Sequence, residues 1–318
     1  MTKHLLAFAL FVLAVPAARA QGADQPTQAL IASDSKSPVT LTSADVTLRV
    51  GNHNVALADI IPIPANRTQV ALLIDDGLRT SISNEFDDLR DFVNSLPPGT
   101  EVFVGYMQSG HVVPAGNIDH FTTNHATVAQ SIRITQGIPA ASASPYVCLS
   151  DFARNWPPPA QGVSTRQQQQ SIHKARFVLM ITNGVDSING NPSPVPQDSP
   201  YVDSAIFDAQ RAGVPVYSIY FDDAGVSARD ASFSGQGYLE ELARSTGAVS
   251  FYHGSGRPSS LAPFLDQFKA ALAASYIAVF PVDARKKLAT LKFSTTLPKT
   301  KLRGPDQVRP GTVILSAQ

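Results

Sequence analysis

Continuous apolar runs alternate with amphipathic helical patterns through the middle of the chain. The run at 70–74 (Val-Ala-Leu-Leu-Ile) has no polar position, which is typical of a strand buried on both faces of a parallel sheet. After it, Ile82, Phe86 and Leu89 follow helical spacing. Further strands are predicted at 101–107, 177–181, 214–221, 249–252 and 276–282, and helices at 126–132, 146–156, 202–209, 239–245 and 261–272. This alternation predicts an open α/β sheet with right-handed crossovers.

Shorter strand patterns flank this region on both sides. Val46, Leu48 and Val50 alternate with polar residues, and residues 289–294 alternate in the same way. Because each flank has one apolar face and too few strands to be stable alone, we expect the two flanks to pack together. The predicted segments are a leader at 1–20, a polar lead-in with a short β segment at 21–66, the α/β domain at 67–282 and a β-rich tail at 283–318.

The first twenty residues have the pattern of an export signal. Lys3 precedes an apolar run at 5–15, and the small residues Ala18 and Ala20 come directly before Gln21 in the pattern of a cleavage site. The run is too short to cross a bilayer as a stable helix. We therefore expect cleavage after Ala20, a periplasmic or secreted protein, and no transmembrane segment in the mature chain.

Charge and cysteine content exclude several classes of protein. Of the 318 residues, 25 are basic and 25 acidic, so the chain lacks the positive charge typical of a nucleic-acid binder. One cysteine, Cys148, excludes an internal disulfide framework and a thiolate zinc cluster. It falls within a predicted helix and is interpreted as a small buried residue. The sequence also contains no phosphate-binding loop and no serine-nucleophile elbow.

Polar residues gather where open α/β sheets bind ligands, at the carboxyl ends of the strands. Three stretches are expected at this edge: 75–79 (Asp-Asp-Gly-Leu-Arg), 142–145 (Ser-Ala-Ser-Pro) and 182–186 (Thr-Asn-Gly-Val-Asp). Taken singly, such residues are ordinary turn and cap signals. Their joint placement predicts that Asp75 and Asn183 lie close together at one edge of the sheet.

This arrangement resembles the von Willebrand factor type A domain. The resemblance spans about 70–282 and rests on the strand order, on 73–76 (Leu-Ile-Asp-Asp), on 180–184 (Met-Ile-Thr-Asn-Gly) and on 242–247 (Leu-Ala-Arg-Ser-Thr-Gly). It implies a three-layer, doubly wound, mostly parallel sheet with β-rich flanking segments. That family holds a divalent cation with Asp-x-Ser-x-Ser after the first strand, a threonine in a middle loop and Asp-Gly after the fourth strand.

When the metal ligands of that family are matched residue by residue to this sequence, the resemblance implies a degenerate metal-ion-dependent adhesion site, that is, one that has lost several of its ligands. Asp75 matches the first aspartate. Gly77 and Arg79 stand where the two serines belong, and Asn183 stands where the second aspartate belongs. A hard divalent cation needs several oxygen ligands and is repelled by a guanidinium group that stays protonated. We therefore expect no metal and no cofactor, with weak magnesium or manganese binding as the alternative.

Other residues complete the expected binding face. Ser144 replaces the threonine of the family, with Ser142 as the alternative. Arg79 is expected to pair with Asp75, Asp76 or Asp186 in place of a cation. The resemblance implies a non-enzymatic module that binds a protein or a surface polymer through this face. The alternatives are an exported hydrolase and a small-ligand binding protein that use the same face.

Overall fold

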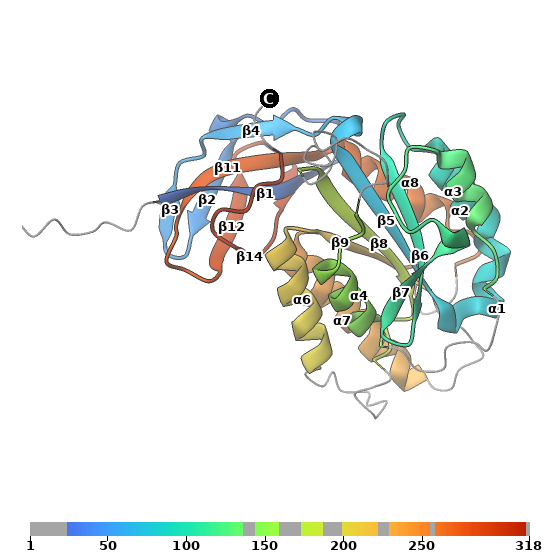
Figure 1. The fold of residues 1–318 in the computed structure, drawn as a ribbon. Helices are drawn as coiled ribbons and strands as arrows, with labels where there is room; N and C mark the ends of the chain where they lie inside the picture. Colours follow the sequence, from blue (N-terminus) through green and yellow to red (C-terminus); the bar gives the residue numbers. More distant parts are fainter. Residues whose placement is uncertain are drawn as a thin grey trace, which may run out of the picture.

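The protein has a mixed α/β fold in which one sheet contains parallel strands. The computed structural model describes residues 24–135, 144–158, 173–186, 199–221, 229–254 and 258–315. Within these ranges six strands form one sheet in the order β10-β9-β8-β5-β6-β7, and all are parallel except the edge strand β7 (Figure 1). The strands are β5 (Thr68–Asp75), β6 (Glu101–Gln108), β7 (His111–Pro114), β8 (Ala175–Thr182), β9 (Val216–Tyr220) and β10 (Ser250–Phe251).

Helices cover both faces of this sheet because its central strands are apolar on both sides. Every residue of β5 is buried. Val70, Leu72 and Ile74 pack into one core, whereas Ala71 and Leu73 pack into another. The first core is completed mainly by α2 (Phe86–Ser95), α3 (His125–Ser131) and α8 (Ala262–Ala273), and the second by α4 (Pro145–Arg154), α6 (Pro200–Ala212) and α7 (Arg229–Thr246) (Figure 1).

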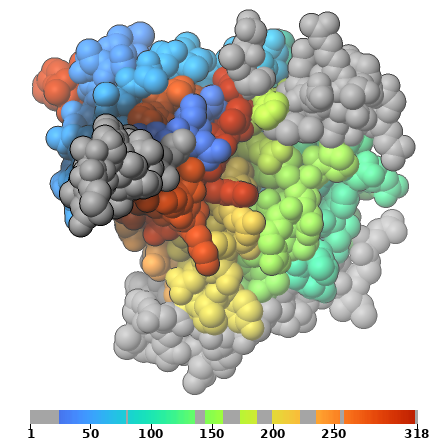
Figure 2. Space-filling model, turned by 60° about the vertical axis from the view of Figure 1, so that its left-hand side comes forward, coloured from blue at the N-terminus to red at the C-terminus, as the bar shows by residue number. Residues whose placement is uncertain are grey.

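The two flanks of the chain form a β-rich part at the amino end of the six-stranded sheet (Figure 1). Leu48 lies opposite Phe293 in an antiparallel pair, which confirms that the flanks pack together. Figure 2 shows the blue N-terminal and red C-terminal segments intermixed in this part. The described strands are β13 (Thr300–Arg303), β1 (Asp24–Ser35), β11 (Ser275–Asp283) and β4 (Asp59–Pro62) in one sheet, and β14 (Gln307–Val308), β12 (Ala289–Thr295), β2 (Val46–Val50) and β3 (His53–Val55) in the other.

Strand β1 corrects the expectation of a polar lead-in after the leader, because Asp24–Ser35 forms a strand. Residues 24–35 pair with β11 along nine positions and with β13 along four. Leu30 packs into the α/β core, while Ala29 and Ile31 pack between the two β-sheets. The apolar stretch is only four residues long, 29–32, so its sequence does not distinguish a doubly buried strand from a loop. The predicted leader, 1–20, lies outside the described residues.

Strand β11 also differs from the prediction, which placed 276–282 in the main sheet. It pairs antiparallel with β1 and β4. Ile277 packs into the α/β core and Ala278 into the core between the β-sheets. Burial on both faces produces the same continuous apolar run as a central parallel strand, so the sequence pattern alone does not separate the two positions.

Candidate functional site

Asp75, the last residue of β5, meets the end of β8 at the carboxyl edge of the sheet. Its Oδ2 accepts a hydrogen bond from Thr182 Oγ1 at 2.6 Å, and its Oδ1 accepts one from the Gly77 amide at 2.9 Å. β5 and β8 are the first and fourth strands of the sheet along the chain, so the winding direction reverses between them. Ligand sites of open α/β sheets lie at this switch point.

The structure confirms that the two predicted segments meet here, but Thr182 makes the contact. Asn183 Oδ1 accepts instead from the Val185 amide at 3.0 Å and closes a local turn. Thr182 was not among the predicted site residues. The position of Thr182 in the sequence could have identified it, because the last residue of a parallel strand lies beside the last residue of its neighbour.

The turn after β8 is packed tightly against α4 and α7. Tyr146 donates from its hydroxyl to the Gly184 carbonyl oxygen at 2.8 Å, and the Gly184 amide donates to Thr182 Oγ1 at 3.0 Å. Gly184 has a φ of 67°, and a Cβ placed there would come within 2.5 Å of the Gly235 carbonyl oxygen. These contacts join residues that are distant in sequence, so spacing gave no indication of Tyr146 or Gly235.

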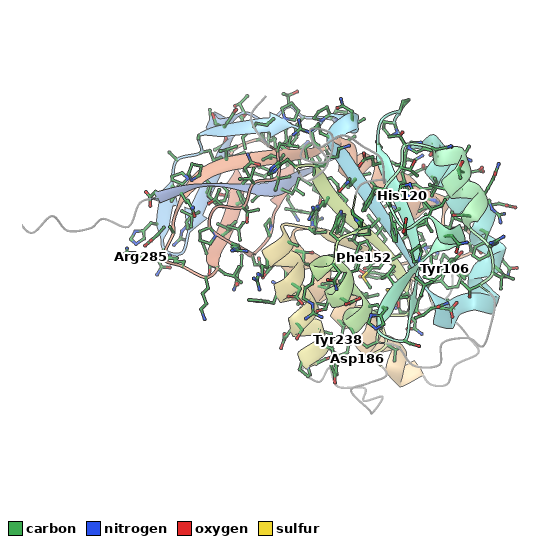
Figure 3. All side chains as sticks on the ribbon, in the orientation of Figure 1. Tyr106, His120, Phe152, Asp186, Tyr238 and Arg285 are labelled. Carbon is green, nitrogen blue, oxygen red and sulfur yellow. The ribbon has the colours of Figure 1, made fainter. Side chains whose placement is uncertain are left out.

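Asp186 and Ser144 each present a buried oxygen atom without a hydrogen-bond partner in the described part of the chain. Ser199 Oγ donates to Asp186 Oδ2 at 2.5 Å and accepts from the Val202 amide, so one hydroxyl both caps α6 and holds the carboxylate. Asp186 Oδ1 and Ser144 Oγ remain unpartnered. Figure 3 labels Asp186 and Tyr238 at this end of the sheet, far from Arg285 in the β-rich part.

Burial disfavours the charged forms of the titratable groups at this edge. It raises the pKa of Asp75, and the neighbouring Asp76 raises it further, while the hydrogen bonds from Thr182 and Gly77 lower it. Burial also raises the pKa of the Tyr146 hydroxyl, with Asp186 as the next contributor. Asp76 is itself buried and accepts from Thr135 Oγ1 at 2.5 Å. The pairing predicted for Arg79 stays a prediction, because its side chain and Ser142 lie outside the described part.

The described residues fit a divalent cation poorly. Both oxygens of Asp75 are engaged, Gly77 has no side-chain ligand, and Asn183 Oδ1 is held by its own turn. Magnesium is usually held by one or two carboxylates together with water, and the one carboxylate oxygen here without a partner in the described residues is Asp186 Oδ1, beside the Ser144 hydroxyl. No group of three or more His, Cys, Asp or Glu side chains suited to a metal occurs in the described ranges.

Two groups that could serve as nucleophiles lack activation. Cys148 is fully buried in α4, and burial raises the pKa of its thiol to about 12. A thiolate is the reactive form of cysteine, so this residue is inert near neutral pH. Ser144 Oγ has no partner within the described residues that could act as a base.

No family model matches the chain, and no curated protein sequence matches it. Among solved structures, a von Willebrand factor type A protein from Catenulispora acidiphila is 9% identical, with a TM-score of 0.46 over 91% of this chain and 75% of that one. The human COPII-coat protein Sec24c is 7% identical, with a TM-score of 0.37 over 79% and 44%. The TFIIH p34 N-terminal domain is 10% identical, with a TM-score of 0.39 over 64% and 98%. At these scores the likenesses assign neither family nor function.

In the part of the chain that the structure describes, no helix is both long and apolar enough to cross a bilayer.

Proposed function

We propose that the chain is an exported, non-enzymatic binding module that contacts a protein or a surface polymer through the carboxyl edge of its six-stranded sheet. The observation that carries this proposal is the pair of buried, unpartnered oxygens, Ser144 Oγ and Asp186 Oδ1, at the edge where Asp75 meets Thr182. Unpartnered buried polar atoms cost free energy, and a polar group from a partner would compensate them.

A von Willebrand factor type A organisation, three-layer and doubly wound, is the second part of the proposal. It is supported by the sheet order with its antiparallel edge strand β7. It is also supported by the positions of Asp75 at the end of the first strand of this sheet, Ser144 before α4, and Asn183 after the fourth strand.

The interaction we propose is independent of a metal and of covalent chemistry. The engaged oxygens of Asp75 and the turn at Asn183 leave too few ligands for tight cation binding. Ser144 Oγ lacks a base, and Cys148 lies in the core. These features support a binding module over a hydrolase that uses the same face.

Export is the third part of the proposal and rests on the leader pattern at 1–20. N-terminal sequencing of the exported protein is expected to begin at Gln21. An intact Met1 on exported protein would contradict it.

The test is capture of partners from the exported fraction with a C-terminally tagged full chain. Wild type, Ser144→Ala and Asp186→Asn are compared with Asp203→Asn, which changes an exposed carboxylate on the first turn of α6. We expect the same partner with wild type and Asp203→Asn, with or without a chelator, and at least tenfold less with the two site variants. Capture that is equal for all four proteins would place the contact surface elsewhere and overturn the proposal.

A further inference from the structure

Buried side-chain atoms without partners occur at two opposite edges of the sheet in the described ranges. Ser144 Oγ and Asp186 Oδ1 belong to the carboxyl edge discussed above. The others are all nitrogen atoms: Nε of Arg67, Nε of Arg176 and Nδ1 of His173. These three lie at the amino edge, where β5 and β8 begin.

Strand pairing brings the three nitrogen-bearing side chains into one neighbourhood. Gln69 on β5 lies opposite Arg176 on β8 in the parallel register. Arg67, two residues before Gln69, donates from Nη2 to the His173 carbonyl oxygen at 2.9 Å. The unpartnered Nε atoms of the two arginines therefore belong to residues at the starts of two adjacent strands.

The acidic side chain of this edge is already paired. Glu101 Oε1 lies 2.7 Å from Lys174 Nζ, and Glu101 Oε2 accepts from Gln69 Nε2 at 2.8 Å. Neither Arg67 nor Arg176 forms an ion pair with a carboxylate of the described residues. The sequence at 157–172 contains no aspartate or glutamate, so the linking segment supplies no counter-charge either.

An aromatic contact orients one of the guanidinium groups. Arg176 lies over the ring of Trp156, with its guanidinium carbon 5.0 Å from the ring centre. Trp156 is fixed in turn by stacking on Phe121 and by donating from Nε1 to Gln69 Oε1 at 3.0 Å. Nε of the stacked guanidinium is buried and has no partner in the described residues, and Nε belongs to the planar fork by which arginine binds carboxylate or phosphate.

We propose that this amino edge is a binding site for a small oxyanion, phosphate or a simple carboxylate, held by Arg67, Arg176 and His173. All of the unpartnered atoms of the two arginines are donors, and arginine has no acceptor, so only an acceptor can complete the site. A cation that is removed from water without a counter-ion is costly, and a bound anion relieves that cost. Burial lowers the pKa of Arg176, in agreement with incomplete compensation of its charge.

Trp156 gives a direct readout, because it is the one tryptophan among the 318 residues. The full chain is titrated with sodium phosphate and, separately, with sodium succinate, and its tryptophan emission is recorded. Sodium chloride at matched ionic strength is the control for screening. We expect a saturable change with phosphate, succinate or both, no saturable change with chloride, and a 1:1 ratio in calorimetry. Comparison of the phosphate and succinate titrations shows whether the site prefers a tetrahedral anion or a carboxylate.

Two variants assign the response to these residues. Arg67→Gln and Arg176→Gln are each expected to weaken binding at least tenfold. Arg211→Gln, which removes an exposed guanidinium at the end of α6, is expected to bind as wild type does. Arg67→Lys keeps the charge but loses the planar fork, so it is expected to bind more weakly than wild type. It tests the role of Arg67 if Arg67→Gln does not fold. A wild type without a saturable response, or a response unchanged by all Arg67 and Arg176 variants, would overturn the proposal.

Discussion

Thr182 donates its hydroxyl hydrogen to the carboxylate of Asp75 at 2.6 Å, across 107 positions of the sequence. The bond joins the ends of the first and fourth strands at the point where the winding of the sheet reverses. The same hydroxyl accepts from the Gly184 amide at 3.0 Å, so it also fixes the turn that follows β8. One side chain thereby couples the buried charge of the site to the conformation of its neighbouring loop.

Replacement of this hydroxyl is expected to destabilise the fold. Thr182→Val keeps the shape of the side chain but leaves the Asp75 carboxylate and the Gly184 amide each with one partner fewer. Hydrogen bonds to buried charged groups contribute about 1.5–3 kcal/mol, so we expect a loss of that size in the free energy of unfolding. Thr182→Ser retains the hydroxyl and is the matched control. Denaturant unfolding measures both, and equal stability of the valine and serine variants would contradict this account.

The pKa of Asp75 should also depend on the hydrogen bond from Thr182. Burial raises its folded-state pKa above the ordinary value of 3.8, and the Thr182 hydroxyl lowers it in part. Thr182→Val should therefore move the pKa of Asp75 further up, as measured by the carboxyl chemical shift in NMR. Because the folded pKa is raised, the contribution of this group to stability is largest below 3.8 and is lost as pH rises through the folded value. A pKa of Asp75 below 3.8 would reverse the sign and refute the prediction.

Two glycines of α7 provide a matched test of the packing beneath the site. A Cβ at Gly235 would lie 2.2 Å from the Asn183 carbonyl oxygen, whereas a Cβ at Gly237 would meet nothing within 4 Å. Gly235→Ala should lower the free energy of unfolding by about 1–3 kcal/mol, because the helix or the turn must move. Gly237→Ala should raise it by about 0.5–1 kcal/mol through helix propensity. If both variants behaved alike in denaturant unfolding, the close approach of α7 to the turn would be wrong.

Gln28, on β1, holds the last described residues of the chain against that strand. Its Oε1 accepts from the amides of Ile314 and Leu315 at 2.7 and 2.8 Å, and its Nε2 donates to the Leu315 carbonyl oxygen at 2.9 Å. Gln28→Ala should release this segment and cost about 1–3 kcal/mol. Gln28→Glu keeps the acceptor and should cost less. Hydrogen exchange at the Ile314 and Leu315 amides should accelerate most in the alanine variant, and unchanged exchange would show that other contacts hold the segment.

The sequence predicted the features of the fold that depend on the local pattern of apolar and polar residues. The apolar run at 70–74 predicted a strand buried on both faces, and the aspartate that follows it lies at the predicted edge. The position of β11 was not predictable, because a strand buried on both faces has the same pattern in a parallel sheet and in an antiparallel one. Tyr146 and Gly235 were also missed, since their roles arise only when α4 and α7 pack against the turn after β8. Thr182 could have been predicted from the sequence, because it directly precedes Asn183.

The last prediction concerns the cation. Wild type is expected to bind magnesium or manganese weakly or not at all, because Asp75 and Asn183 have their oxygens engaged in the fold. The combined variant Gly77→Ser, Arg79→Ser and Asn183→Asp supplies two hydroxyls and a carboxylate and removes a positive charge, so it should gain cation affinity.

The change at Gly77 is the most demanding of the three. A Cβ there would lie 3.1 Å from Asp75 Oδ1, so the carboxylate must shift by a few tenths of an ångström and exchange its amide hydrogen bond for the cation. The variant without it, Arg79→Ser with Asn183→Asp, should therefore gain less affinity and serves as the control. Calorimetry with magnesium decides between these outcomes. Tight 1:1 binding by wild type that is lost in Asp75→Ala would show that Asp75 exchanges its protein partners for a metal, and that the site is not degenerate.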